Sequence, residues 1–160
     1  MTRSTRRGAP LAVLAAAALG TVLGGAAAHA QEGMVSVPSP HDVATTVDRL
    51  ERVLGEKGMT VFARIDHASG AEEAGLSLPP TEVLVFGNPQ VGTPLMGCAR
   101  SVAIDLPQKM LAWEDDSGAT RLGWNDPAYL RERHRVEGCD AVLEKIGAAL
   151  DAFARAAIAE

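Results

Sequence analysis

Two histidines are the side chains in this sequence best suited to acid–base chemistry. His67 ends an alternating apolar segment, directly after Asp66, and His134 follows Arg133. An imidazole changes charge near neutral pH, so either ring could act as a general acid or base. Adjacent residues of a strand point to opposite faces, so Asp66 is not expected to orient His67. The alternatives are a strand-end histidine bonded to the backbone at His67 and a solvated helix face at His134.

A corner between an apolar segment and a helix-like pattern, residues 86–96, is the most strongly shaped stretch of the chain. It holds two glycines, two prolines, an asparagine and a threonine, all of which restrict backbone geometry. Asn88 is expected either to cap the next turn or to bind a polar group of a ligand. Thr93-Pro94 is typical of a helix N-cap followed by the first helical residue. No general base stands at a recognisable spacing from Thr93, which argues against a nucleophile.

We expect these residues to form a site where the second and third strands end. His67, Asn88, Gly92 and Thr93 are its candidate ligand-binding residues, and His134 is a further candidate. Glycine permits close approach of a ligand to the backbone, and a helix N-terminus favours negative charge, so a small polar or anionic ligand is expected. The alternative is that the same residues only hold the corner together by hydrogen bonds.

The sulfur-containing residues do not predict a metal site. Methionines with His67 and His134 would suit a soft metal such as copper, but they are not clustered in the sequence, and there is no CxxC pair. We therefore expect no metal and no cofactor. Cys98 and Cys139 are candidates for a disulfide, and two buried thiols are the alternative.

The first 30 residues differ in composition from the remaining chain. Three arginines precede an uncharged stretch rich in Ala, Leu, Val and Gly over residues 11–28, and Ala28-His29-Ala30 follows. This is the plan of a secretory signal peptide, with cleavage expected after Ala30. A membrane anchor is the alternative. We expect residues 31–160 to form one periplasmic or secreted domain.

The charge of the chain excludes some partners. The formal net charge is −5, and without the three arginines of the leader it becomes −8. An acidic chain with no basic stripe is poorly suited to binding nucleic acid or an anionic membrane. We therefore expect a small-molecule ligand, no nucleic acid, no membrane after cleavage of the leader, and a homodimer as a possible assembly.

Hydrophobic periodicity predicts an α+β domain. Strands are expected over residues 34–38, 59–67, 82–86, 109–114 and 119–124. Helices are expected from 40 to before Gly58, from 94 to about 102, over 129–136 and from 140 onward, with a helical turn in 68–75. Ser39 is the expected N-cap of the first helix. The order β-α-β-(α)-β-α-β-β-α-α predicts an antiparallel sheet of about five strands with the long helices on one face.

Several segments together resemble the bacterial and archaeal family called domain of unknown function 302. The matching segments are Phe62-Ala63-Arg64-Ile65-Asp66-His67-Ala68, Phe86-Gly87-Asn88-Pro89, Gly92-Thr93-Pro94-Leu95-Met96, Asp105-Leu106-Pro107, Ala112-Trp113-Glu114-Asp115 and Arg133-His134. The resemblance implies an architecture similar to the TATA-binding protein, with a long helix on an antiparallel sheet, and it implies no function. The sequence departs from the family pattern at Trp124, where a tyrosine is expected, and at Cys98.

Three functions compete at this stage. The leading one is a small exported binding or accessory domain for a polar or anionic ligand, because no nucleophile–base pattern is present. An enzyme that uses His67 or His134 as general acid or base is the second. A structural, partner-binding domain is the third.

Overall fold

The computed structural model describes Met1 and residues 33–160, so the expected cleavage site after Ala30 lies outside the described residues. The strands are β1 (Met34–Pro38), β2 (Thr60–Asp66), β3 (Thr81–Gly87), β4 (Gln108–Glu114) and β5 (Thr120–Asn125). The helices are α1 (Val43–Glu56), α2 (His67–Glu73), α3 (Pro89–Cys98), the 3₁₀ helix η1 (Arg100–Ile104), α4 (Pro127–His134) and α5 (Asp140–Ala157). This is the predicted α+β order.

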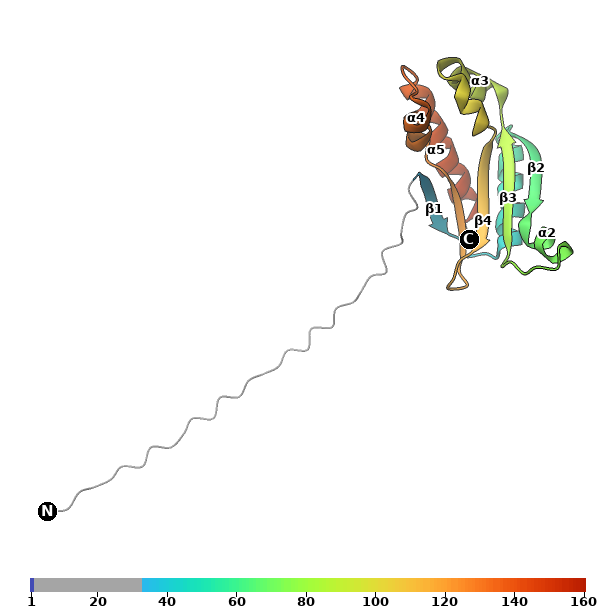
Figure 1. Cartoon of the computed structure of the whole chain (residues 1–160), viewed down its shortest axis with the longest axis vertical. Helices are drawn as coiled ribbons and strands as arrows, with labels where there is room; N and C mark the ends of the chain where they lie inside the picture. The colour runs from blue at the N-terminus through green and yellow to red at the C-terminus, as the bar shows by residue number, and fades with distance from the viewer. Residues whose placement is uncertain (2–32) are drawn as a thin grey trace.

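The strands form one antiparallel sheet in the order β1-β5-β4-β3-β2 (Figure 1). The predicted β4–β5 hairpin is confirmed, with Trp113 opposite Arg121 in its register. Asp115 holds the turn by accepting hydrogen bonds from the Ser117 side chain and from backbone N–H groups. These bonds lower the pKa of Asp115, because they favour the ionised carboxyl group.

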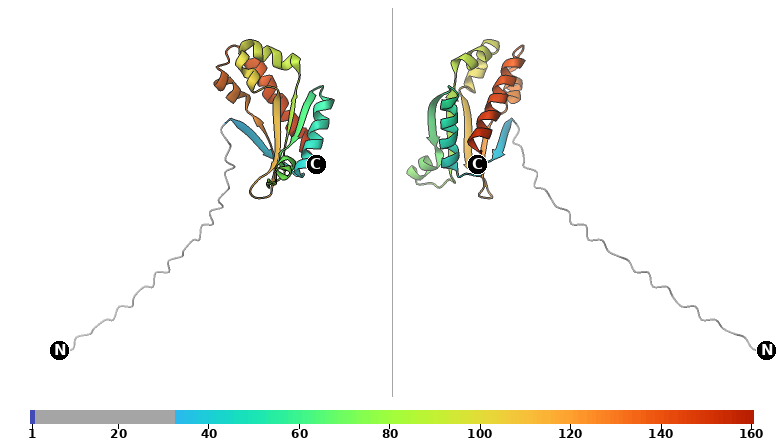
Figure 2. Two further views of the ribbon diagram at one scale, coloured as in Figure 1. Left: turned by 45° about the vertical axis from the view of Figure 1, so that its right-hand side comes forward. Right: turned by 180° about the vertical axis from the view of Figure 1, so that it is seen from behind.

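Helices α1 and α5 cover the same face of the sheet, as the view from behind shows (Figure 2). The sheet contributes fully or almost fully buried side chains to the core between them: Leu84, Phe86, Met110, Ala112, Leu122 and Trp124. The Phe86 ring meets the Phe153 ring of α5 edge to face, with centroids 6.2 Å apart. Within the described part of the chain, no helix is both long and apolar enough to cross a membrane.

A β-bulge in β2 alters which residues face the helices. Val61 pairs with Phe86 and Ala63 pairs with Val85, so Phe62 is the extra residue. Regular alternation would place Val61, Ala63 and Ile65 on one face. Because the bulge reverses the alternation, Arg64 instead shares the core-facing side with its partner Leu84, while Ile65 lies on the outer face.

Two helices have N-cap residues other than those predicted. The N-cap of α1 is Asp42 rather than Ser39, and its carboxylate accepts the Thr45 N–H at 2.7 Å. That bond lowers the pKa of Asp42. The Ser39 hydroxyl instead pairs with the Thr46 hydroxyl at 2.7 Å. Helix α3 begins five residues before the predicted start, with Asn88 as its N-cap, so Thr93-Pro94 lies inside the helix.

Candidate functional site: a pocket beneath α3

A pocket of about 300 Å³ lies where the end of β3 and the start of β4 meet helices α3 and α5. Apolar side chains from β2 and the residue before it, from β3 and from α5 form much of its lining: Met59, Phe62, Phe86, Ile146, Leu150 and Phe153. The connection that follows α3 adds Ala103, Leu106 and Pro107. The pocket is therefore assembled from segments that lie far apart in the sequence and meet only in the fold.

Helix α3 forms one wall of this pocket through the glycine- and proline-rich corner singled out from the sequence. Asn88, Val91, Gly92, Thr93 and Met96 all belong to the lining. Asn88 also fixes the start of the helix, because its Oδ1 accepts the Gln90 N–H at 2.9 Å. Of the candidate residues, the structure thus brings Asn88, Gly92 and Thr93 together at one pocket.

Gln108 places a buried amide nitrogen beside the pocket. Gln108 is the first residue of β4 and belongs to the lining. Its Nε2 atom is buried and has no hydrogen-bond partner among the described residues. A buried donor left unpaired costs about 1–3 kcal/mol, so such atoms are rare. Sequence reasoning missed Gln108; the available signal was a polar residue after Pro107 at the start of an apolar strand.

The other polar groups of the lining are few. Lys145 of α5 is exposed and contributes the positive charge of the lining. Thr93 is also exposed, and the Asn88 side chain is engaged in capping. The pocket is thus a mainly apolar surface with one cation, and a buried donor lies beside it. That composition suits a more apolar ligand than the small polar or anionic one expected from the sequence.

His67 does not belong to this site, and the predicted patch of His67 with Asn88 and Thr93 is wrong. Thr60 pairs with Gly87, and Asp66 pairs with Glu82. The C-terminal ends of β2 and β3 therefore lie at opposite ends of this strand pair. Helix α2, which starts at His67, and helix α3, which starts after Asn88, accordingly lie at opposite ends of the molecule (Figure 1). His67 is exposed, and Asp66 caps α2 through the Ser69 N–H.

His134 lies in a separate polar cluster between α4 and η1. Its side chain is only 5% exposed, which contradicts the expected solvated helix face. The ring Nε2 is 2.5 Å from Asp105 Oδ2, and Nδ1 is 3.0 Å from Ser101 Oγ. Arg133 Nη1 lies 3.3 Å from the other Asp105 oxygen. Sequence reasoning proposed His134 but did not identify Ser101 or Asp105 as its partners.

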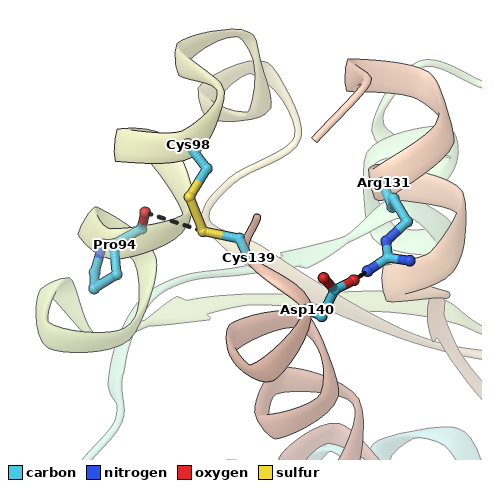
Figure 3. Close-up of a disulfide and its surroundings, with 5 residues drawn as sticks. All are labelled: Pro94, Cys98, Arg131, Cys139 and Asp140. Atoms are coloured by element: carbon cyan, nitrogen blue, oxygen red, sulfur yellow. Dashed lines mark hydrogen bonds and ion pairs between the residues drawn. A yellow bond between two sulfur atoms is a disulfide. The ribbon is translucent and has the colours of Figure 1, made fainter. Parts of the chain in front are cut away.

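A disulfide joins Cys98 to Cys139, which decides between the two alternatives left open by the sequence. The Cα atoms are 6.4 Å apart, and 41 positions separate the two residues in the chain. The bond connects the end of α3 to the residue that precedes α5 (Figure 3). Arg131 of α4 pairs with Asp140 at the first turn of α5 (Figure 3). Three helices are therefore held together beside the pocket.

The structure does not gather the methionines and histidines considered as copper ligands. Met59 and Met96 line the pocket, whereas Met110 is fully buried in the core and His67 lies at the far end. Within residues 33–160, no three His, Cys, Asp or Glu side chains are grouped so that they could hold a metal ion.

Comparisons with known proteins identify a family without an assigned function. A family model described as "Domain of unknown function DUF302" matches residues 35–153. A crystal structure of an uncharacterised conserved DUF302 protein from Bacillus stearothermophilus has a TM-score of 0.64, covering 80% of this chain and 97% of that one. At 23% sequence identity this likeness shows the fold alone.

Curated relatives match over part of their length. The chain is 53% identical over 104 residues to a protein of Brucella suis named "Fluoride-specific ion channel FluC 1" and to one of Brucella abortus with the same name. The match spans 65% of this chain but only 41% and 38% of those proteins. The names describe the longer proteins.

Proposed function

Because this chain belongs to the DUF302 family, whose description gives no activity, we propose a function from its pocket: it binds a small molecule with an apolar body and a hydrogen-bond acceptor. The single observation that carries this proposal is the unpaired, buried Nε2 atom of Gln108. The proposal keeps the binding-domain hypothesis, and it adds an apolar body to the small polar or anionic ligand expected from the sequence.

The size and lining of the pocket support an apolar body for the ligand. Ligand pockets commonly enclose about 300–1,000 Å³, and this one lies at the lower end of that range. A ligand would contact aromatic and aliphatic side chains of the lining, among them Phe62, Leu150 and Phe153. Burial of apolar surface contributes about 25 cal/mol per Å², so a short alkyl or aryl group would supply most of the binding energy.

The polar groups support an acceptor, preferably an anionic one, on the ligand. Gln108 Nε2 can only donate, and a turn of this side chain toward the pocket would let the amide meet an acceptor of the ligand. Lys145 adds a positive charge in the same lining. A carboxylate at one end of an alkyl chain offers both an acceptor and a negative charge, and a cationic head offers neither.

Two probes with the same body and opposite heads test this proposal. Octanoate should raise the melting temperature of the protein and bind measurably by calorimetry, because it offers an acceptor to Gln108. Octylammonium should do neither.

Gln108→Met should weaken octanoate binding about tenfold, since a hydrogen bond to a charged group contributes about 1.5–3 kcal/mol. The same substitution should stabilise the free protein by about 1 kcal/mol, because it removes an unpaired buried donor.

Gln90→Met is the matched control, since Gln90 is an exposed residue of α3 outside the lining. It should change neither stability nor octanoate binding. The proposal is wrong if octanoate and octylammonium act alike, or if Gln108→Met destabilises the free protein as the loss of an ordinary structural hydrogen bond would.

A further inference from the structure

Ser101, His134 and Asp105 form a linear hydrogen-bonded array that the pocket does not use. Ser101 Oγ lies 3.0 Å from His134 Nδ1, and His134 Nε2 lies 2.5 Å from Asp105 Oδ2. The histidine side chain is 5% exposed and that of Asp105 is 12% exposed, whereas Ser101 is an exposed residue. A hydroxyl at the surface is therefore backed by an imidazole and a carboxylate that are largely withdrawn from water.

The partners of the ring decide which nitrogen carries the proton in neutral His134. A carboxylate only accepts hydrogen bonds, so Asp105 requires the proton on Nε2. Nδ1 then presents its lone pair to Ser101, whose hydroxyl donates to it. Arg133 Nη1 lies 3.3 Å from the second oxygen of Asp105. The array thus has the roles of nucleophile, base and orienting carboxylate, with the two ring nitrogens exchanged relative to the serine proteases.

The array opens onto a different surface from the pocket. Because a 3₁₀ helix has three residues per turn, Ser101, Val102 and Ala103 point to three different sides of η1. Val102 is fully buried in the core, Ala103 lines the pocket and Ser101 contacts His134. Ile104, one turn after Ser101, shares its side of η1 and is 73% exposed. An exposed apolar side chain thus lies on the same side as the hydroxyl and offers contact surface for a small acyl group.

The geometry points to Ser101 as the nucleophile of a second site, which hydrolyses small carboxylic esters with good leaving groups. Ser101 Oγ attacks the ester carbonyl carbon, and the hydroxyl proton passes to His134 Nδ1. The bond to the leaving alcohol then breaks, and the alcohol takes that proton. A water molecule attacks the acyl-serine and gives one proton to Nδ1, which returns it to Ser101 as the acid leaves. The sum is ester and water to acid and alcohol. Asp105 acts as a positioning residue that holds the ring.

Covalent labelling and turnover test this assignment directly. A fluorophosphonate probe should modify Ser101, with fluoride as the leaving group, and mass spectrometry of the digested protein locates the adduct. Hydrolysis of 4-nitrophenyl acetate should fall about tenfold or more in Ser101→Ala and in His134→Gln, because the nucleophile or the base is lost. Glutamine suits the second variant because its side-chain N–H can still donate to Asp105. The melting temperature of each variant reports whether it is folded.

Ser117 provides a matched control within the same chain. It is exposed, and its hydroxyl donates to the Asp115 carboxylate at 2.6 Å with no histidine between them. The proposal predicts no adduct at Ser117 and unchanged turnover in Ser117→Ala. Labelling of Ser101 no faster than of Ser117 would overturn it. Full turnover in Ser101→Ala would also do so, whatever the folding of the His134 variant, since that substitution removes only an exposed hydroxyl.

Discussion

At the scale of single residues, Arg64 shows how the bulge in β2 creates a requirement for charge pairing. Because the bulge turns Arg64 toward the helix-covered side, the guanidinium meets three carboxylates there. Its Nε donates to Glu82 Oε2 at 2.7 Å, and its Nη1 donates to Asp48 Oδ1 at 2.6 Å. Glu82 is 8% exposed, so removal of Arg64 would leave its carboxylate buried without this ion pair. The same bonds hold the pKa of Arg64 above its usual range.

Arg64→Met should destabilise the protein by about 2 kcal/mol in urea unfolding. Breaking a fully buried pair costs about 3–5 kcal/mol, and the smaller figure allows for solvent screening of the partly exposed arginine. The double variant Arg64→Met, Glu82→Met should recover most of the loss, because no unpaired buried charge remains. Equal losses in the single and double variants would show that the arginine acts through packing of its aliphatic stem instead.

At the scale of elements, α3 is held in position by contacts other than the buried apolar face of an ordinary amphipathic helix. Leu95 is its one buried side chain, and Pro94 interrupts its hydrogen-bond ladder. Its start is fixed by Asn88, and its last residue, Cys98, is bonded to Cys139 before α5. Since α3 and α5 form facing parts of the pocket, the disulfide connects two of its walls.

Replacing both cysteines by alanine should lower the free energy of unfolding by about 3–4 kcal/mol, the loop-entropy value for a separation of this size. Octanoate binding should weaken as well, because α3 is then less firmly placed over the pocket. Chemical unfolding and calorimetry of the double variant measure the two effects. Reduced wild-type protein should show the same lower free energy of unfolding and the same weaker octanoate binding. Reductant should change neither quantity in the double variant. Unchanged affinity in a folded double variant would mean that the disulfide stabilises the fold without shaping the pocket.

At the scale of the whole molecule, the sequence predicted the strands and helices well. It did not predict which parts of them lie next to one another in the fold. Periodicity and turn residues are local signals, and they identified every strand and the long helix α5. The predicted site is wrong because it required His67 and Asn88 at the same end of the sheet. The antiparallel strands β2 and β3 place these residues at opposite ends. The pocket also brings Gln108 close to α5, and no local pattern contains that contact.

The wrongly predicted starts of α1 and α3 have one cause: each helix has two possible N-cap residues in its sequence. Both Ser39 and Asp42 can cap α1, and the carboxylate of Asp42 is the one that reaches the Thr45 N–H. Asn88-Pro89 and Thr93-Pro94 are equivalent signals for the start of α3. The structure uses the first, because Asn88 directly follows β3 and can bond to Gln90. Such choices depend on where the preceding strand ends.

The Cys98–Cys139 disulfide bears on where the whole molecule resides, since a disulfide persists in an oxidising compartment. We predict that the protein isolated from its native host begins at Gln31, free or cyclised, as the leader pattern over residues 1–30 implies. Its intact mass should also lack the two thiol hydrogens of Cys98 and Cys139. Residues 31–160 produced in a reducing cytoplasm should instead show two alkylatable thiols and a lower melting temperature. An intact mass that includes the first 30 residues would contradict the cleavage, and free thiols in freshly isolated exported protein would contradict the link between export and the disulfide.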